Sequence, residues 1–441
     1  MTIPSTPHQP QAAKAHREPS YEFGRREVEV MARFPSGHRV PVTRTRVRSY
    51  PGLTSVAPST LAFYQAFASV LSAKHVLDAG SGSSHGTRVL CERVAHVTAL
   101  DNDARALEFG QEYAPNAEFL QADLCHGSPV DVADAAVLVD VLGHLANPES
   151  ALRSLRACLP VASKLFVAEP KAYASQRLLA PVSRAYSKRA LRHLLLRSGF
   201  EVEDLDCSGA TFVTLVAGRS ADVAIDALVE GFQQAARGQL SAARSEFARA
   251  RRSDREDVQL EAILGEAEAA FSANEGDIAT RCYFEANDLA VDDGRALAGL
   301  ARVALATGEL DDALRLAADA VKRDPTDAGA NTALALAAEQ LGHTDAFNAW
   351  RVAANLAPDD PEVATGLARV SAAKQNYAFA IQALERLRGY GKLLSLEFHV
   401  TLGWLLLADG RKSDASVEAR YALGLAPGHE AVVELVQALD A

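Results

Sequence analysis

The sequence predicts two folded regions, an α/β domain with a mostly parallel sheet and an all-α domain of repeated helix pairs. Between residues 75 and 218, apolar strand-like runs alternate with helix-like stretches, which is typical of a parallel sheet with helices on both faces. The first of these runs leads directly into a glycine turn. After Gly218, alanine- and leucine-rich helical segments recur with a period of about 34 residues.

Length and composition agree with more than one domain. The 441 residues exceed the size of one ordinary core, and no apolar run is long enough to span a bilayer. The N-terminus has no hydrophobic signal region and the five cysteines show no metal-ligand spacing, so a cytoplasmic protein with reduced thiols is expected. The net charge of −14 over residues 221–441 disfavours nucleic-acid binding there, and no membrane contact is expected.

The segment before the predicted sheet divides into two parts. Residues 1–20 are rich in Pro, Gln, Ser and Ala and are expected to form a disordered tail. Residues 27–34 and 39–48 alternate in polarity around the turn sequence 35–38, which predicts a β-hairpin within a covering segment at 21–58. A helix is expected from Pro58 to about Ser72.

Seven strands are expected in the α/β domain, at 75–79, 96–101, 117–122, 135–141, 164–169, 200–206 and 211–218. The last two lie too close together in the chain for a helix between them. They are therefore predicted to form an antiparallel pair at one edge of the sheet.

The turn after the first strand indicates a ligand site. Gly80 and Gly82 allow a sharp turn and a close approach of the backbone to a ligand. The helix that follows would direct its free N–H groups at that ligand. The second strand ends in Asp101, 23 residues after Asp78, a spacing suited to a carboxylate that accepts hydrogen bonds from ribose hydroxyls. The pattern predicts a nucleotide-like ligand at the carboxyl ends of the strands.

With these residues in view, the chain over 50–218 resembles class I S-adenosylmethionine (SAM) dependent methyltransferases. The resemblance rests on Asp78–Gly82, Asp101, Gln121–Leu124 and the loop Asp140–Glu149 after the fourth strand. It implies a Rossmann-like, seven-stranded domain over 59–219 with SAM as cofactor. The residues that it assigns to the cofactor are Asp78, Gly80, Ser81, Gly82, Asp101, Asn102, Asp123, Leu124 and Asp140.

Other interpretations of this domain stay open. Ser84 stands where many members of the family carry a third glycine. One alternative is an NAD-dependent oxidoreductase, whose fingerprint would require glycine near Ser84 or His85. The predicted antiparallel edge pair also matches the strand order of methyltransferases better than that of such an oxidoreductase. A scaffold whose domain binds SAM without turnover is the second alternative. In many relatives the segment before the first strand closes over SAM, which makes Thr54, Ser55 or Tyr64 candidates for that contact.

Catalysis of methyl transfer requires in-line positioning and, for some acceptors, removal of a proton. His144 follows the fourth strand and its imidazole titrates near neutral pH, so it is the candidate general base. The alternative is that His144 only bonds a backbone group or contacts the cofactor. Asp140 and Glu169, at neighbouring strand ends, are candidates for orienting the acceptor. In the family, the stretch corresponding to 170–190 often helps to form the acceptor pocket, which suggests Tyr173, Arg177 and Tyr186 as substrate-binding residues.

Residues 220–441 resemble tetratricopeptide repeats (TPR). Turns recur at Gly238, Gly276, Gly308, Gly342, Gln375 and Gly410, at spacings of 38, 32, 34, 33 and 35 residues. About six helix pairs are expected, with atypical first and last pairs as caps. The resemblance implies a concave groove for a protein or peptide partner, and self-association into a homo-oligomer is the alternative.

These expectations combine into one function. The chain is expected to transfer a methyl group from SAM to an oxygen or nitrogen of a protein, a peptide or a small metabolite. The TPR-like region would recruit the substrate, a partner or a second subunit. The sequence does not identify the acceptor.

Overall fold

The computed structural model describes residues 28–33, 39–44, 58–127, 130–171, 184–203, 212–389 and 394–440. Strands β1 (Val28–Arg33) and β2 (Arg39–Arg44) pair antiparallel, as expected for the hairpin. The tail expected at 1–20 lies outside the described residues, as do Thr54, Ser55, Tyr173 and Arg177.

A seven-stranded mixed sheet forms the first region, with the strand order β5-β4-β3-β6-β7-β9-β8. Strands β5, β4, β3, β6 and β7 pair parallel, while β9 is antiparallel to both of its neighbours, which confirms the predicted edge pair. The strands are β3 (His75–Ala79), β4 (His96–Asp101), β5 (Glu118–Gln121), β6 (Ala135–Val139), β7 (Lys164–Pro170), β8 (Phe200–Glu203) and β9 (Phe212–Arg219).

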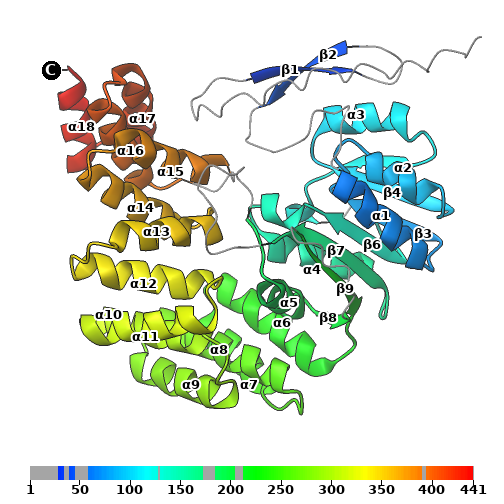
Figure 1. The fold of residues 1–441 in the computed structure, drawn as a ribbon, viewed down its shortest axis with the longest axis horizontal. Helices are drawn as coiled ribbons and strands as arrows, with labels where there is room; N and C mark the ends of the chain where they lie inside the picture. The colour runs from blue at the N-terminus through cyan, green and yellow to red at the C-terminus, as the bar shows by residue number, and fades with distance from the viewer. Residues whose placement is uncertain are drawn as a thin grey trace, which may run out of the picture.

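Helices cover both faces of this sheet (Figure 1). Alternation along β3 places Val76 and Leu77 in different apolar clusters. The Val76 cluster includes Phe63 and Phe67 of α1, and the Leu77 cluster includes side chains of α4 and α5. The helices of this region are α1 (Pro58–Val70), α2 (His85–Cys91), α3 (Ala104–Tyr113), α4 (Pro148–Cys158), α5 (Lys188–Arg197) and the short 3₁₀ turns η1 (Leu124–His126) and η2 (Leu142–His144).

Strand β6 ends two residues earlier than the sequence suggests. The expected strand continues to Val141, but Asp140 has a φ of 57°, in the left-handed region. A residue in that conformation cannot continue the pleat of a strand, so the chain turns away from the sheet at this point. The turn places the side chain of Val141 against Gly80, directly after the carboxyl end of β3.

The second region is a solenoid of paired helices in a TPR-like arrangement, which curves beside the sheet (Figure 1). Fully buried alanines such as Ala313 and Ala317 let neighbouring helices pack closely. Within the described residues, none of the helices is both long and apolar enough to span a membrane. The helices are α6 (Val223–Ala236), α7 (Leu240–Ala250), α8 (Glu256–Ser272), α9 (Gly276–Leu289), α10 (Arg295–Thr307), α11 (Leu310–Arg323), α12 (Ala328–Gln340), α13 (Ala346–Leu356), α14 (Pro361–Ala373), α15 (Tyr377–Gly389), α16 (Leu396–Ala408), α17 (Lys412–Leu425) and α18 (Glu430–Asp440).

The solenoid packs against α5 through a buried ionic network. Glu261 of α8 is fully buried and lies 2.6 Å from Arg197, 2.7 Å from His193 and 2.6 Å from Arg295. Beside it, Leu196 of α5 belongs to the apolar cluster of α6, α7 and α8. The two regions therefore share both a charged and an apolar interior.

Candidate active site

The turn after β3 is built so that only glycine fits at its start. Gly80 has a φ of 82°, and a Cβ there would lie 2.6 Å from a methyl carbon of Val141. The carbonyl oxygen of Leu100 accepts hydrogen bonds from the amides of Gly80, at 2.7 Å, and Ser81, at 3.0 Å. The turn is thus fixed between the ends of β4 and β6, and its residues line a pocket.

Asp101, at the end of β4, is held by the backbone on both of its oxygens. Its Oδ2 accepts a hydrogen bond from the amide of Gly82, and its Oδ1 accepts one from the amide of Asp103, both at 2.9 Å. The residue is 3% exposed and lines the pocket. Each carboxylate oxygen has further lone pairs, so this side chain is a preorganised acceptor for hydroxyl groups of a ligand.

Asp78 lies beneath the turn and does not line the pocket. Its Oδ1 accepts a hydrogen bond from the Tyr64 hydroxyl at 2.8 Å, and its Oδ2 accepts one from the Thr87 hydroxyl at 2.6 Å. Complete burial raises the pKa of the carboxyl group to about 6, and the two hydrogen bonds only partly oppose this rise. Asp78 thus ties α1 and α2 to the end of β3.

Because of this raised pKa, the folded protein binds the Asp78 proton more tightly than the unfolded chain does. The stabilisation is fully present below about pH 4 and is lost as the pH rises through about 6. We expect the free energy of unfolding, taken relative to Asp78→Asn, to fall by about 3 kcal/mol over that range. Urea denaturation at a series of pH values measures it, with Asp131→Asn as an exposed control. A difference that stays constant with pH would contradict the expectation.

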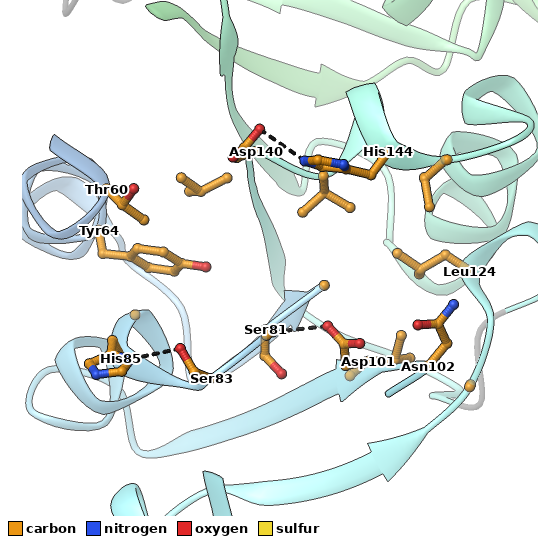
Figure 2. Close-up of a pocket in the computed structure, with 18 of the residues that line it drawn as sticks. Thr60, Tyr64, Ser81, Ser83, His85, Asp101, Asn102, Leu124, Asp140 and His144 are labelled. Atoms are coloured by element: carbon orange, nitrogen blue, oxygen red, sulfur yellow. Dashed lines mark hydrogen bonds and ion pairs between the residues drawn. The ribbon is translucent and has the colours of Figure 1, made fainter. Parts of the chain in front are cut away.

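The opposite wall of the pocket carries Asp140 and His144, which face the glycine turn (Figure 2). The Nε2 atom of His144 lies 3.4 Å from Oδ1 of Asp140. The His144 side chain is 15% exposed, while that of Asp140 is 33% exposed. A histidine beside a carboxylate at the mouth of a ligand pocket is an arrangement that can accept a proton.

Glu169, at the end of β7, lies behind this wall and is completely buried. Its Oε1 accepts hydrogen bonds from the amides of Val141, at 2.9 Å, and Leu142, at 2.7 Å, and its Oε2 accepts one from the amide of Gly143 at 3.1 Å. Burial, and next the charge of Asp140, raise the pKa of Glu169 to about 7. The side chain holds the loop 141–144 and does not line the pocket.

Eight of the nine residues assigned to the cofactor from sequence line one pocket of about 130 Å³. Two features besides Asp101 fit SAM there. The hydroxyl of Ser81 is buried and has no hydrogen-bond partner among the described residues, and the glycine turn admits close approach of a ligand. Asp78 supports the pocket from below. The lining residues on this list are Gly80, Ser81, Gly82, Asp101, Asn102, Asp123, Leu124 and Asp140.

The pocket also contains Tyr64, which the sequence named as a candidate, and Thr60, Ser83 and His85, which it did not single out as ligand contacts. Thr60 and Tyr64 of α1 close one end, and Ser83 and His85 line the wall below them (Figure 2). Ser83 and His85 belong to the quoted glycine-turn motif, so their position next to Gly82 was the available signal. Tyr186, expected to bind substrate, is 5% exposed and packs beneath the loop 141–144, and it also lines a second cavity.

A second, larger cavity of about 630 Å³ lies between the sheet region and the solenoid. We call it the interdomain cleft. One wall is formed by Ala146–Glu149 and by α5, and the other by α10 and the turn between α11 and α12. Residues 144 and 145 line the first pocket, so the interdomain cleft begins directly after them in the chain.

Comparisons with known proteins agree with this geometry. Residues 77–167 match the family model described as a methyltransferase domain. A stretch of 59 residues is 41% identical to the trans-aconitate 2-methyltransferase of Paracidovorax citrulli (strain AAC00-1), covering 13% of this chain and 23% of that protein. The chain thus matches about a quarter of the length of this curated relative.

Solved structures similar to each region were also found. A SAM-dependent methyltransferase from Aquifex aeolicus is 19% identical, with a TM-score of 0.33, and the match covers 37% of this chain and 94% of that one. The APC/C hetero-tetramer Cut9-Hcn1 is 18% identical, with a TM-score of 0.42, and the match covers 49% of this chain and 42% of that one. Residues 77–167 thus match a methyltransferase domain, a family that implies SAM as the cofactor, and a region of TPR-like paired helices follows in the structure.

Proposed function

We propose that this protein is a SAM-dependent methyltransferase acting on an oxygen or nitrogen acceptor. Residues 59–219 form its catalytic domain and residues 220–441 its interaction domain. The proposal rests on one pocket whose two opposite sides carry different groups of side chains. Asp101, fixed by two backbone amides, lies on one side, and the pair Asp140 and His144 lies on the other.

The cofactor-binding residues divide by their position along the pocket. Asp101 would accept hydrogen bonds from the ribose hydroxyls, with Asn102 next to it, and Asp123 and Leu124, after β5, would hold the adenine. The glycine turn, with the Ser81 hydroxyl, would hold the methionine part. SAM, when bound, supplies a methyl group that is already activated by a positive sulfur.

The residues of the loop 140–144 remove the proton from the acceptor. His144 accepts the proton that an oxygen or nitrogen acceptor gives up when it is methylated. Asp140 stabilises the imidazolium that forms, because its carboxylate lies 3.4 Å from Nε2. Glu169 acts through the backbone: it fixes the loop that carries His144, which differs from a direct role in orienting the acceptor.

Titration of the purified protein with SAM, S-adenosylhomocysteine and NAD by calorimetry tests the cofactor assignment. We expect affinities on the order of micromolar for the first two ligands and no binding of NAD. Asp101→Ala should weaken SAM binding by about tenfold to a hundredfold, because it removes charge-assisted hydrogen bonds. Glu92→Ala, on the exposed end of α2, is the matched control. If neither adenosyl ligand binds, the protein is a scaffold and the enzymatic proposal is wrong.

The acceptor, in this proposal, belongs to a protein or peptide that occupies the interdomain cleft. The cleft is several times larger than the cofactor pocket and runs past the loop that carries His144. A chain lying in it can reach the pocket from the side of Leu145. A second copy of the protein, or a small metabolite, would use the same opening. The four described cysteines form no disulfide with one another, which is consistent with the proposed cytoplasmic location.

Methyl-labelled SAM added to a cell extract with the full chain distinguishes these acceptors. Label in the macromolecular fraction supports a protein or peptide, and label only in the small-molecule fraction would show that the acceptor is a metabolite. Arg302→Glu reverses an exposed charge on the solenoid wall of the cleft. This variant should reduce protein labelling while SAM affinity stays the same.

A further inference from the structure

One short segment, Arg184–Tyr186, contacts the active-site loop and the solenoid at the same time. The amide of Arg184 donates a hydrogen bond to the carbonyl oxygen of Gly143 at 2.9 Å. A Cβ at Gly143 would lie 2.3 Å from the carbonyl oxygen of Arg184, so the two backbones are in direct contact. Next along the chain, the Tyr186 hydroxyl lies 3.4 Å from the carbonyl oxygen of Leu142.

The side chain of Arg184 crosses to the solenoid. Its Nε donates a hydrogen bond to Oδ1 of Asp359 at 3.1 Å, and a second guanidinium nitrogen pairs with Oδ2. The side chains of Arg184 and Asp359 are only 14% and 12% exposed. A two-point arginine–carboxylate pair in a buried setting fixes both position and orientation. Asp359 itself lies in the turn between α13 and α14, and the next residue, Asp360, caps α14.

The loop that carries His144 is therefore held from two directions. Glu169 binds its amides from within the sheet region, and the Arg184–Tyr186 segment binds its carbonyl oxygens at Leu142 and Gly143. The guanidinium of Arg184 also donates a hydrogen bond to the Tyr186 hydroxyl at 3.0 Å. The first support belongs to the sheet region alone. The second depends on a carboxylate 175 residues away in the chain.

We propose that Asp359 is a positioning residue, through which the solenoid sets the geometry of the loop 141–144. The catalytic consequence rests on the function proposed above, but the mechanical coupling does not. Without the Asp359 carboxylate, the largely buried Arg184 loses its charged partner and moves toward water. Its backbone then no longer supports Gly143, and the position of His144 becomes less defined. Because Arg184 and Asp359 both line the interdomain cleft, a ligand seated there acts directly on this pair.

Hydrogen exchange of the full chain tests the coupling without any assay of activity. Asp359→Asn should speed exchange of the amides of residues 141–145 by at least tenfold. Asp226→Asn is the matched control, because it breaks another pair between the two regions, Asp226 with Arg156, that does not contact the loop. Asp226→Asn should change the exchange rates of the same amides by less than twofold. Exchange in β3 and β4 reports general loss of structure and should not change in either variant.

Arg184→Lys provides a second variant that keeps the charge but loses the two-point geometry, and it should give an intermediate increase in exchange at 141–145. If exchange there is equal in Asp359→Asn and Asp226→Asn, or if β3 and β4 exchange faster to the same extent, the proposed positioning role is wrong. Where SAM binding is established, kcat for Asp359→Asn should fall at least fivefold and KM for SAM should change less than twofold. Failure of SAM binding would remove the enzymatic proposal and leave the exchange result standing.

Discussion

His144→Ala should lower turnover by about a hundredfold or more, while the affinity for SAM changes by less than about threefold. General bases contribute about 10²–10⁴ to rate when they are positioned to accept a proton. His144 lies at the pocket with Asp140 beside it, but the glycine turn and Asp101, which are assigned to the cofactor, lie on the opposite wall. Single-turnover rates with labelled SAM, together with calorimetric binding, separate the two effects.

A histidine outside the pocket supplies the control for this experiment. The side chain of His126 is 84% exposed, so His126→Ala should leave turnover unchanged. The pH dependence adds a second readout, because a rate that depends on proton removal by His144 should rise with pH in the wild type and lose that rise in the variant. Small and equal effects on turnover and on SAM affinity would show that His144 is not the base.

Glu261→Ala should lower the free energy of unfolding by about 3–5 kcal/mol. The substitution leaves Arg197, Arg295 and His193 without the buried carboxylate that they surround. Complete burial would raise the pKa of Glu261, but the guanidinium groups of Arg295 and Arg197 hold it well below its usual range. Because the network joins α5 to α8 and α10, its loss weakens the contact between the sheet region and the solenoid. Urea denaturation followed by circular dichroism measures the change.

Glu201→Ala is the matched control for the buried network. Glu201 pairs with Arg255 at 2.9 Å and also joins the two regions, but its side chain is 44% exposed. Exposed pairs contribute about 0–1 kcal/mol, so this variant should stay close to the wild type. Similar decreases in the free energy of unfolding in both variants would show that the buried Glu261 network stabilises the protein no more than the exposed Glu201 pair does.

Most of the fold was predictable because it depends on local patterns. Apolar runs separated by helical stretches located all seven strands of the sheet, and glycine turns at a regular spacing located the helix pairs. The end of β6 was not predictable in the same way. Val139 and Val141 are both apolar and suited to a strand, but the left-handed backbone of Asp140 depends on contacts with the neighbouring strand and loop.

The candidate site was predictable in position but not in the direction of each side chain. As their spacing in the sequence suggests, four acidic residues lie at or near the carboxyl ends of the parallel strands: Asp78, Asp101, Asp140 and Glu169. Sequence spacing does not reveal which carboxylates face the pocket and which bind the backbone beneath it. Glu169 accepts its hydrogen bonds from residues 26 to 28 positions earlier in the chain, so no local pattern could show that role.

The short connection between β9 and α6 has a consequence for attempts to divide the protein. Only residues 220–222 separate the strand from the helix, and the Ser220 hydroxyl binds Glu201 while Asp222 caps α6. Truncation at this point would uncover Leu196 on one fragment and its apolar partners on the other. Each fragment would then expose an apolar surface to solvent. The fragment that ends at residue 219 is therefore expected to aggregate when it is produced alone. Biochemical experiments should use all 441 residues.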